Sequence, residues 1–160
     1  MTETTGVVPD RLVVDRLIYL MHRIRVSTSE AVGAALADVD LNGTQGLIIE
    51  SLYELGEVGA AELARRCLVS RQALSAPLDK LEQRGLVSRP ASHHSARVRP
   101  VSLTAEGRAV AEVARRRVAA LETASREIFG TEDLQRFTAM LERYAQFWDD
   151  TAEAAGGRRG

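Results

Sequence analysis

The sequence is poor in the features that crosslink a protein or anchor it in a membrane. It has one cysteine, which excludes an internal disulfide and is typical of a reducing compartment. No window approaches the ~20 apolar residues that a membrane helix requires, and no basic segment precedes an apolar block as in a secretory signal. We therefore expect a cytoplasmic protein that does not contact a membrane.

The usual signatures of catalysis are missing as well. The sequence contains no glycine-rich phosphate loop, no nucleophile elbow and no pair of carboxylates at a catalytic spacing. This pattern argues against an enzyme, and we expect no cofactor.

Positive charge is concentrated in one part of a chain whose net charge is only −1. Residues 1–61 carry four basic residues against nine acids, and residues 109–160 carry eight against nine. Residues 62–108 reverse this balance, with nine basic residues against four acids. Such asymmetry can arise by chance, but a phosphate-facing surface requires it. Its meaning depends on the motif with which it coincides.

That motif is the segment 60–104, which has the pattern of a helix, a turn, a second helix and two strands. Its first half places apolar residues at helical spacing, namely Leu63, Ala64, Cys67, Val69, Leu74, Leu78 and Leu81. Ser70 is a good N-cap for the second helix, because its hydroxyl can accept from a free backbone N–H. Gly85 stands where that helix would stop, and Val87 begins an extended run. The pattern predicts a winged helix-turn-helix.

The predicted wing is a polar hairpin between two short strands. Its second strand leads through Val101 and Leu103 into Thr104, a further N-cap candidate. Val58, in the turn before the motif, is expected to form a short strand against the wing. The predicted fold class is mainly α with a small β wing, an α+β arrangement.

Helices are predicted on both sides of the motif. Apolar periodicity marks a helix over 10–37. Asn42 and Gln45 have the spacing of a capping box for a helix that reaches Leu55. The side chains expected to face inward from this second helix are Leu47, Ile48, Leu52 and Leu55.

After the wing, one long helix is predicted to run to about Phe129, with Arg115–Arg117 on a solvated face. Thr131 is expected to cap the last helix after Gly130 ends the previous one. The last helix carries an apolar stripe at spacings of 3 and 4 residues, formed by Leu134, Phe137, Leu141, Tyr144 and Trp148. Because such a stripe needs a partner surface, we expect the first and last helices to form a homodimer interface.

The order and spacing of these elements resemble the MarR (multiple antibiotic resistance regulator) family of bacterial transcription factors. The resemblance is carried by LNGTQGLIIESL, AAELARRCLVSRQALSAPLDKLEQRGLVSR and SARVRPVSLTAEGR, between Leu41 and Arg108. It implies a triangular homodimer that binds a pseudo-palindromic operator in double-stranded DNA, usually as a repressor. In this family small aromatic acids or phenols often relieve repression, and some relatives sense oxidants or metals.

The sequence predicts the following organisation. Residues 1–9, which show no periodicity, are expected to be a disordered N-terminus, 10–152 a MarR-like domain and 153–160 a disordered tail. Within the domain the DNA-binding winged helix-turn-helix covers 42–104. The N- and C-terminal dimerisation helices cover 10–37 and 105–152.

The residues of the second motif helix suggest how DNA is read. A recognition helix places its first turns in the major groove, and here those turns carry Ser70, Arg71, Gln72 and Ser75. Arg71 can pair bidentately with guanine and Gln72 with adenine. Alternatively, Arg71 contacts a phosphate, which positions the protein without reading sequence.

The predicted wing tip carries His93, His94, Arg97 and Arg99. An arginine there reads the width and potential of the minor groove. Arg97 matches the arginine that family members carry near the wing tip, and Arg99 points to the same face of the strand. A metal site at the two histidines is disfavoured, because adjacent strand residues point to opposite faces and no cysteine or acid cluster lies nearby.

Three positions depart from the family pattern. Ser95 stands where many relatives have an aspartate that pairs with the wing arginine, and Ala76 stands where a basic residue is frequent. Pro77 removes a hydrogen bond to the Ala73 carbonyl at a cost of ~3 kcal/mol, so the helix is expected to kink or restart there. An alternative function is therefore a dimeric winged-helix interaction module that has lost specific DNA binding.

Two further predictions concern sensing. Cys67 could sense oxidants, but its apolar position favours a buried structural thiol. The resemblance implies an effector pocket between the first two helices, the helix after the wing and the DNA-binding lobe. Tyr19, His22 and Arg23 could offer it an aromatic wall and partners for a small aromatic ligand. Alternatively, Tyr19 and His22 complete the dimer interface.

Overall fold

The computed structural model describes residues 16–89 and 100–156. The elements in chain order are α1 (Leu17–Ala35), the 3₁₀ turn η2 (Ala37–Val39), α2 (Gly43–Leu55), β1 (Val58–Gly59), α3 (Ala60–Arg66), α4 (Arg71–Gln83), β2 (Val87–Ser88), β3 (Pro100–Leu103), α5 (Ala105–Arg126) and α6 (Thr131–Gly156). The chain divides into two compact units between Val118 and Ala119. The predicted fold class, mainly α with a small β wing, is confirmed.

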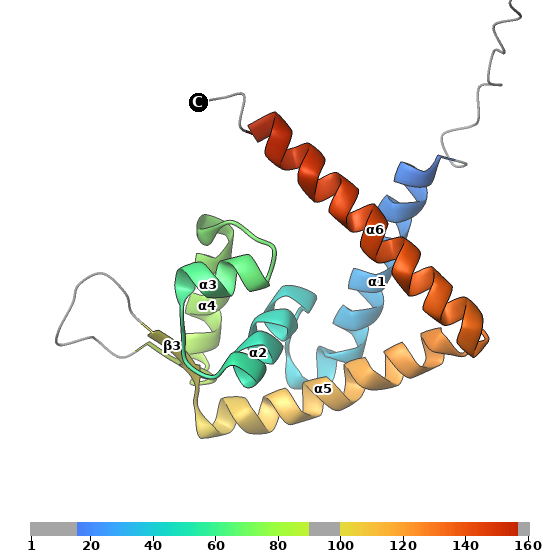
Figure 1. Ribbon diagram of the computed structural model, residues 1–160. Helices are drawn as coiled ribbons and strands as arrows, with labels where there is room; N and C mark the ends of the chain where they lie inside the picture. Colours follow the sequence, from blue (N-terminus) through green and yellow to red (C-terminus); the bar gives the residue numbers. More distant parts are fainter. Residues whose placement is uncertain (1–15, 90–99, 157–160) are drawn as a thin grey trace, which may run out of the picture. The chain divides into compact units, whose positions relative to one another are not determined.

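The first unit is a winged helix-turn-helix lobe in which α2, α3 and α4 lie together beside β3 (Figure 1). Its three-stranded antiparallel sheet has the order β1-β3-β2. Val58 pairs with Val101 and Val87 pairs with Leu103, so the short strand predicted at Val58 is confirmed. The core is closed by large side chains with no more than about 1% exposure, namely Leu36, Ile48, Ile49, Leu52, Leu63, Leu74, Leu81 and Val101.

Side-chain caps fix where the helices of this lobe begin. The capping box predicted at α2 is present: the Gln45 N–H donates to Asn42 Oδ1 at 2.9 Å, and the Asn42 N–H donates to Gln45 Oε1 at 3.1 Å. Thr104 caps α5, because its Oγ1 accepts from the Gly107 N–H at 3.0 Å. The same hydroxyl donates to the Gly85 carbonyl at 2.7 Å, which joins the end of α4 to the start of α5.

Two helix ends lie close to the predicted ones, and one predicted cap was wrong. Helix α1 ends at Ala35, two residues before residue 37, and α5 ends at Arg126, three residues before Phe129. Thr131 is the first residue of α6 and not its cap, because the Gly130 carbonyl already accepts from the Leu134 N–H. The part of the predicted first helix before residue 16 lies outside the described residues.

Two leucines expected to face inward from α2 are exposed. Leu47 is 43% exposed because it lies about 200° around the helix from the buried Ile49. Leu55 is 40% exposed although it lies on the buried side, and it is the last residue of the helix. Ile48 and Leu52 are buried as predicted.

The second unit contains the end of α5, the turn after it and α6. The rings of Phe129 and Phe137 stack across the turn with centroids 4.8 Å apart. Further along α6, Trp148 makes edge contacts with Tyr144 and with Phe147. None of the residues of α6 whose side chains are described is buried, so the described part of the chain covers its predicted apolar stripe only in part.

Candidate nucleic-acid interface and ligand cavity

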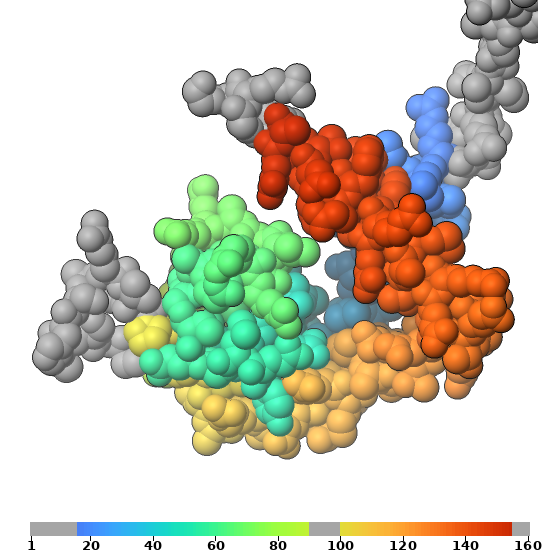
Figure 2. Space-filling view, viewed as in Figure 1, coloured from blue at the N-terminus to red at the C-terminus, as the bar shows by residue number. Residues whose placement is uncertain are grey.

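Helix α4 buries one face and presents polar side chains on the other. Ser70 caps it, since its Oγ accepts from the Ala73 N–H at 3.1 Å, as predicted. Its inward face consists of the buried Leu74, Leu78 and Leu81. Its first turns expose Arg71, Gln72 and Ser75, the side chains expected to read DNA. In the space-filling view, α3 and the start of α4 form a green surface opposite the yellow first half of α5 (Figure 2).

Pro77 lies inside α4, and the helix continues through it to Gln83. The expected restart is therefore not observed. Proline has no N–H, so the Ala73 carbonyl lacks its usual partner within the helix. This gap in the hydrogen-bond ladder lies between the exposed first turns and the C-terminal half of the helix.

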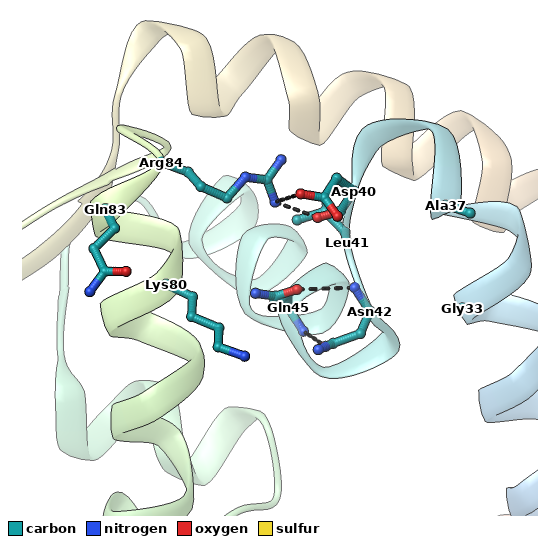
Figure 3. A pocket seen from close by; sticks show the side chains of 9 residues that line it. All are labelled: Gly33, Ala37, Asp40, Leu41, Asn42, Gln45, Lys80, Gln83 and Arg84. Atoms are coloured by element: carbon teal, nitrogen blue, oxygen red, sulfur yellow. Dashed lines mark hydrogen bonds and ion pairs between the residues drawn. The ribbon is translucent and has the colours of Figure 1, made fainter.

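The C-terminal end of α4 is attached to the linker between α1 and α2. The Arg84 guanidinium donates to the Val39 carbonyl at 2.9 Å and to the Asp40 carbonyl. Figure 3 shows this side chain reaching Asp40, with Lys80 and Gln83 on the same helix. These residues line a hollow of about 670 Å³. Asp40 has a φ of 51° and is therefore in the left-handed conformation within this tight turn. The recognition helix is thus fixed at its far end to the body of the lobe.

A second attachment joins α4 to the wing. Arg89, directly after β2, donates through Nε to Glu82 at 2.9 Å and through Nη2 to Asp79 at 2.7 Å. Both carboxylates belong to α4, and the Arg89 side chain is 24% exposed. The hydrogen bond to Glu82 raises the pKa of the Arg89 guanidinium above its ordinary value, partly offset by burial, and Asp79 adds to the rise. Arg89 was not predicted as a site residue, because a cation at residue 89 shows no pattern in the sequence until the strand folds back beside α4.

The wing-tip residues expected to contact DNA, His93, His94, Arg97 and Arg99, lie outside the described residues. Their roles stay predictions.

A cavity of about 700 Å³ lies in the first unit between α1, α2 and α5, where the resemblance implied an effector pocket. Its wall is mostly apolar and includes Val32, Leu36, Leu47, Val69 and Val118. Two cations, Arg25 and Arg115, and one acid, Glu50, lie at its lining. The arrangement suits a small apolar ligand with one anionic group.

Tyr19, His22 and Arg23 do not line this cavity. They lie on α1 before its first lining residue, Ile24, where Tyr19 is half-buried and the other two are exposed. Arg25 and Arg115 were not predicted to line the cavity, because their position there depends on how three helices pack together.

The run Arg115–Arg117 was expected to lie on a solvated face, but Arg115 also makes contacts within the lobe. Its guanidinium lies over the Tyr53 ring, 4.6 Å from the centroid, with Glu54 about 4.0 Å away. Glu54 also accepts from Arg66 of α3 at 2.7 Å. Arg117 pairs with Asp38. The cavity cation is thereby held by an aromatic ring and an acid.

Cys67 is a buried thiol, as predicted, with 3% exposure. Burial raises the pKa of the Cys67 thiol above its ordinary value, and a contact with the Ser51 hydroxyl at 3.7 Å and the charge of Arg66 oppose that rise. This setting disfavours the reactive thiolate that an oxidant sensor requires.

Residues 16–89 and 100–156 contain no group of three or more histidine, cysteine or acidic side chains that could hold a metal ion. None of the helices in this part of the chain is long and apolar enough to cross a membrane.

Comparison with known proteins gives a consistent result. A model described as the MarR family matches residues 39–97. The HTH-type transcriptional repressor Rv2887 of Mycobacterium tuberculosis is 35% identical over 125 residues, which cover 78% of this chain and 90% of that protein. The crystal structure of Rv2887 with salicylic acid superposes with a TM-score of 0.64 at 34% identity, over 84% of this chain and 98% of that one.

A second solved structure shares the architecture more closely. The transcriptional repressor CouR, bound to a 23-mer DNA duplex, has a TM-score of 0.75 at 27% identity and covers 84% of this chain and 99% of its own. The fold, the exposed recognition helix and these likenesses agree: the chain belongs to the MarR family of transcriptional regulators.

Proposed function

We propose that this protein is a homodimeric repressor that binds a pseudo-palindromic operator and releases it when a small aromatic acid binds. The observation that carries the proposal is the first turn of α4, which exposes Arg71, Gln72 and Ser75 on a helix whose other face is locked into the core. Side chains in this position can reach base edges in a major groove. The DNA duplex bound by the relative CouR supports the same use here.

The ligand is proposed to occupy the cavity between α1, α2 and α5. Its apolar wall suits an aromatic ring, and Arg25 and Arg115 suit a carboxylate. The relative Rv2887 has been crystallised with salicylic acid, a molecule of this class. Ligand binding can release DNA only if it favours a dimer with differently spaced recognition helices, because half-sites on one DNA face lie ~34–36 Å apart.

The dimer is proposed to form through the terminal helices. Helix α6 leaves Met140, Phe147 and Trp148 exposed, and α1 leaves Leu17, Ile18 and Ile24 exposed. Apolar surface of this extent on two helices is typical of a subunit interface.

The DNA proposal is tested by selecting binding sites from a random duplex pool. We expect the wild-type protein to enrich an inverted repeat, with affinity that falls steeply as salt is raised. Arg71→Ala should abolish the sequence preference, whereas the control Arg65→Ala, on α3 and already paired with Glu62, should retain it. An Arg97→Ala variant is expected to weaken binding to all sequences alike.

Failure to enrich any site would overturn the repressor proposal. It would instead favour the interaction module as the function of the dimer.

The ligand proposal is tested by titrating salicylate into the protein with and without the selected DNA. Linkage requires DNA to weaken salicylate by the same factor as salicylate weakens DNA, with a coupling of ~1–3 kcal/mol. Arg25→Ala and Arg115→Ala should lose the response while retaining DNA binding. If His22→Ala and Arg23→Ala lose it instead, the ligand lies at the residues predicted from the sequence. Equal salicylate affinity with and without DNA would contradict both locations.

A further inference from the structure

The contact between Arg89 and helix α4 has a consequence for how DNA is read. Asp79 and Glu82 lie three residues apart, on neighbouring turns of α4, and both accept from the guanidinium of Arg89. A guanidinium that donates to two carboxylates is fixed in orientation as well as in distance, because its donors form a planar fork. We call these three residues the Asp79–Arg89–Glu82 clamp.

The clamp joins the two parts of the lobe that DNA would meet. Asp79 and Glu82 follow the exposed first turns of α4 by one to two helical turns. Arg89 comes directly after β2, at the point where the chain enters the predicted wing tip. These parts are also joined by backbone hydrogen bonds, such as that from the Leu86 N–H to the Leu81 carbonyl at 2.9 Å, and Leu86 and Val87 are buried in the core.

Pro77 makes this attachment more consequential. The missing hydrogen bond at the Ala73 carbonyl weakens α4 between its DNA-facing turns and its C-terminal half. Arg84 and the clamp hold the C-terminal half to the lobe by polar contacts, whereas the first half is held to the core through the buried Leu74.

We propose that Arg89 is a positioning residue, which sets the wing relative to the recognition helix through Asp79 and Glu82 and does not itself contact DNA. The inference rests on the proposed operator binding. Two carboxylates already neutralise this guanidinium, so it has little positive charge to offer a phosphate. Its effect is on the spacing of the two DNA-reading parts.

The positioning role is testable, because removing the two clamp acids should raise DNA affinity through charge but lower operator affinity through loss of positioning. Asp79→Asn with Glu82→Gln removes two negative charges from a DNA-binding lobe, and simple electrostatics expects tighter binding to any DNA. If the clamp positions the wing, the same variant should bind the selected operator about tenfold more weakly, while its affinity for random duplex is unchanged or higher. The control Glu57→Gln with Glu112→Gln makes the same charge change at exposed acids of the same lobe and should retain operator preference.

Two more measurements separate positioning from direct contact. Arg89→Gln should weaken operator binding about tenfold, and adding it to the double acid variant should cause no further loss, because both changes break one clamp. The slope of log affinity against log salt should stay unchanged in Arg89→Gln, whereas loss of a phosphate contact lowers it by about one. If circular dichroism shows that Arg89→Gln does not fold, Asp79→Asn alone provides the test, because asparagine has nearly the same shape as aspartate.

The outcomes are distinct. Unchanged or tighter operator binding by the acid variants, or a reduced salt slope in Arg89→Gln, overturns the positioning role and leaves operator binding intact. A wild-type protein that selects no DNA site overturns the proposed function, and the inference fails with it.

Discussion

The two units of the chain satisfy their apolar side chains in opposite ways. The winged lobe buries a large core of leucines, isoleucines and valines, from Leu36 in the turn after α1 to Val101 in β3, although Leu47, Leu55 and Leu68 stay exposed. Helix α6 spans 26 residues without burying one described side chain. The difference indicates that the lobe can close its own core, whereas the stripe on α6 needs a partner surface that the described residues do not supply in full.

The largest loss of stability is expected when the apolar stripe on α6 can no longer pack against its partner surface. Placing carboxylates in the stripe with Tyr144→Glu and Trp148→Glu should cost several kcal/mol per buried charge, comparable with the whole ~5–15 kcal/mol stability of a domain. Because obligate dimers often have no stable folded protomer, we expect unfolded or aggregated protein rather than a monomer. Light scattering detects aggregation, and circular dichroism detects loss of helical structure.

Gln146→Glu is the control for this prediction. It adds a carboxylate to the same helix about 200° from Tyr144, and it should leave the dimer intact. A wild-type protein that is monomeric at micromolar concentration would contradict the proposed interface.

The next largest loss of stability is expected in the core of the lobe, where two leucines of α2 can be compared. Leu52→Ala empties a site with 0% exposure and should lower the free energy of unfolding by ~2–5 kcal/mol. Leu55→Ala, three residues later and 40% exposed, should cost less than ~1 kcal/mol. Urea unfolding gives both values. Equal losses would mean that Leu55 is covered in the assembled protein.

A smaller effect is expected from the backbone gap in α4. Pro77→Ala supplies an N–H for the Ala73 carbonyl and should raise the free energy of unfolding by ~1–2 kcal/mol, after the greater chain entropy of the unfolded variant is subtracted. Thermal unfolding of this variant and of the control Gln72→Ala, an exposed position of the same helix, tests it. No gain would show that the helix has already adapted to proline.

The features that the sequence predicted well are those with local causes. The capping box at Asn42 and Gln45, the cap at Ser70 and the turn at Gly85 each depend on residues within four positions of one another. The order of the helices and strands followed from them, because hydrophobic periodicity and caps act within one element.

The features that escaped prediction depend on contacts between distant segments. Arg89 acquires its role from carboxylates seven and ten residues earlier, and Arg115 from Tyr53 and Glu54, about 60 residues earlier. Leu47 is apolar at a helical spacing, yet it lines a cavity instead of the core. Periodicity identifies an apolar face but not what lies opposite it.

The smallest effect tests how tightly the lobe closes around Cys67. Burial raises the pKa of this thiol in the folded state, so the neutral form is favoured by folding. Its contribution to stability is therefore fully present below the unfolded pKa of about 8.5 and is lost as pH rises through the higher folded value. Over that window the wild type should lose stability faster than Cys67→Ala, by at most ~1.4 kcal/mol per pH unit.

Urea unfolding at pH 7 and at pH 9.5 to 10 measures the difference, and native thiol labelling should be slow throughout. Equal pH dependence in the two proteins, or rapid labelling at neutral pH, would show that the core opens at Cys67 and is less closed than the contrast with α6 requires.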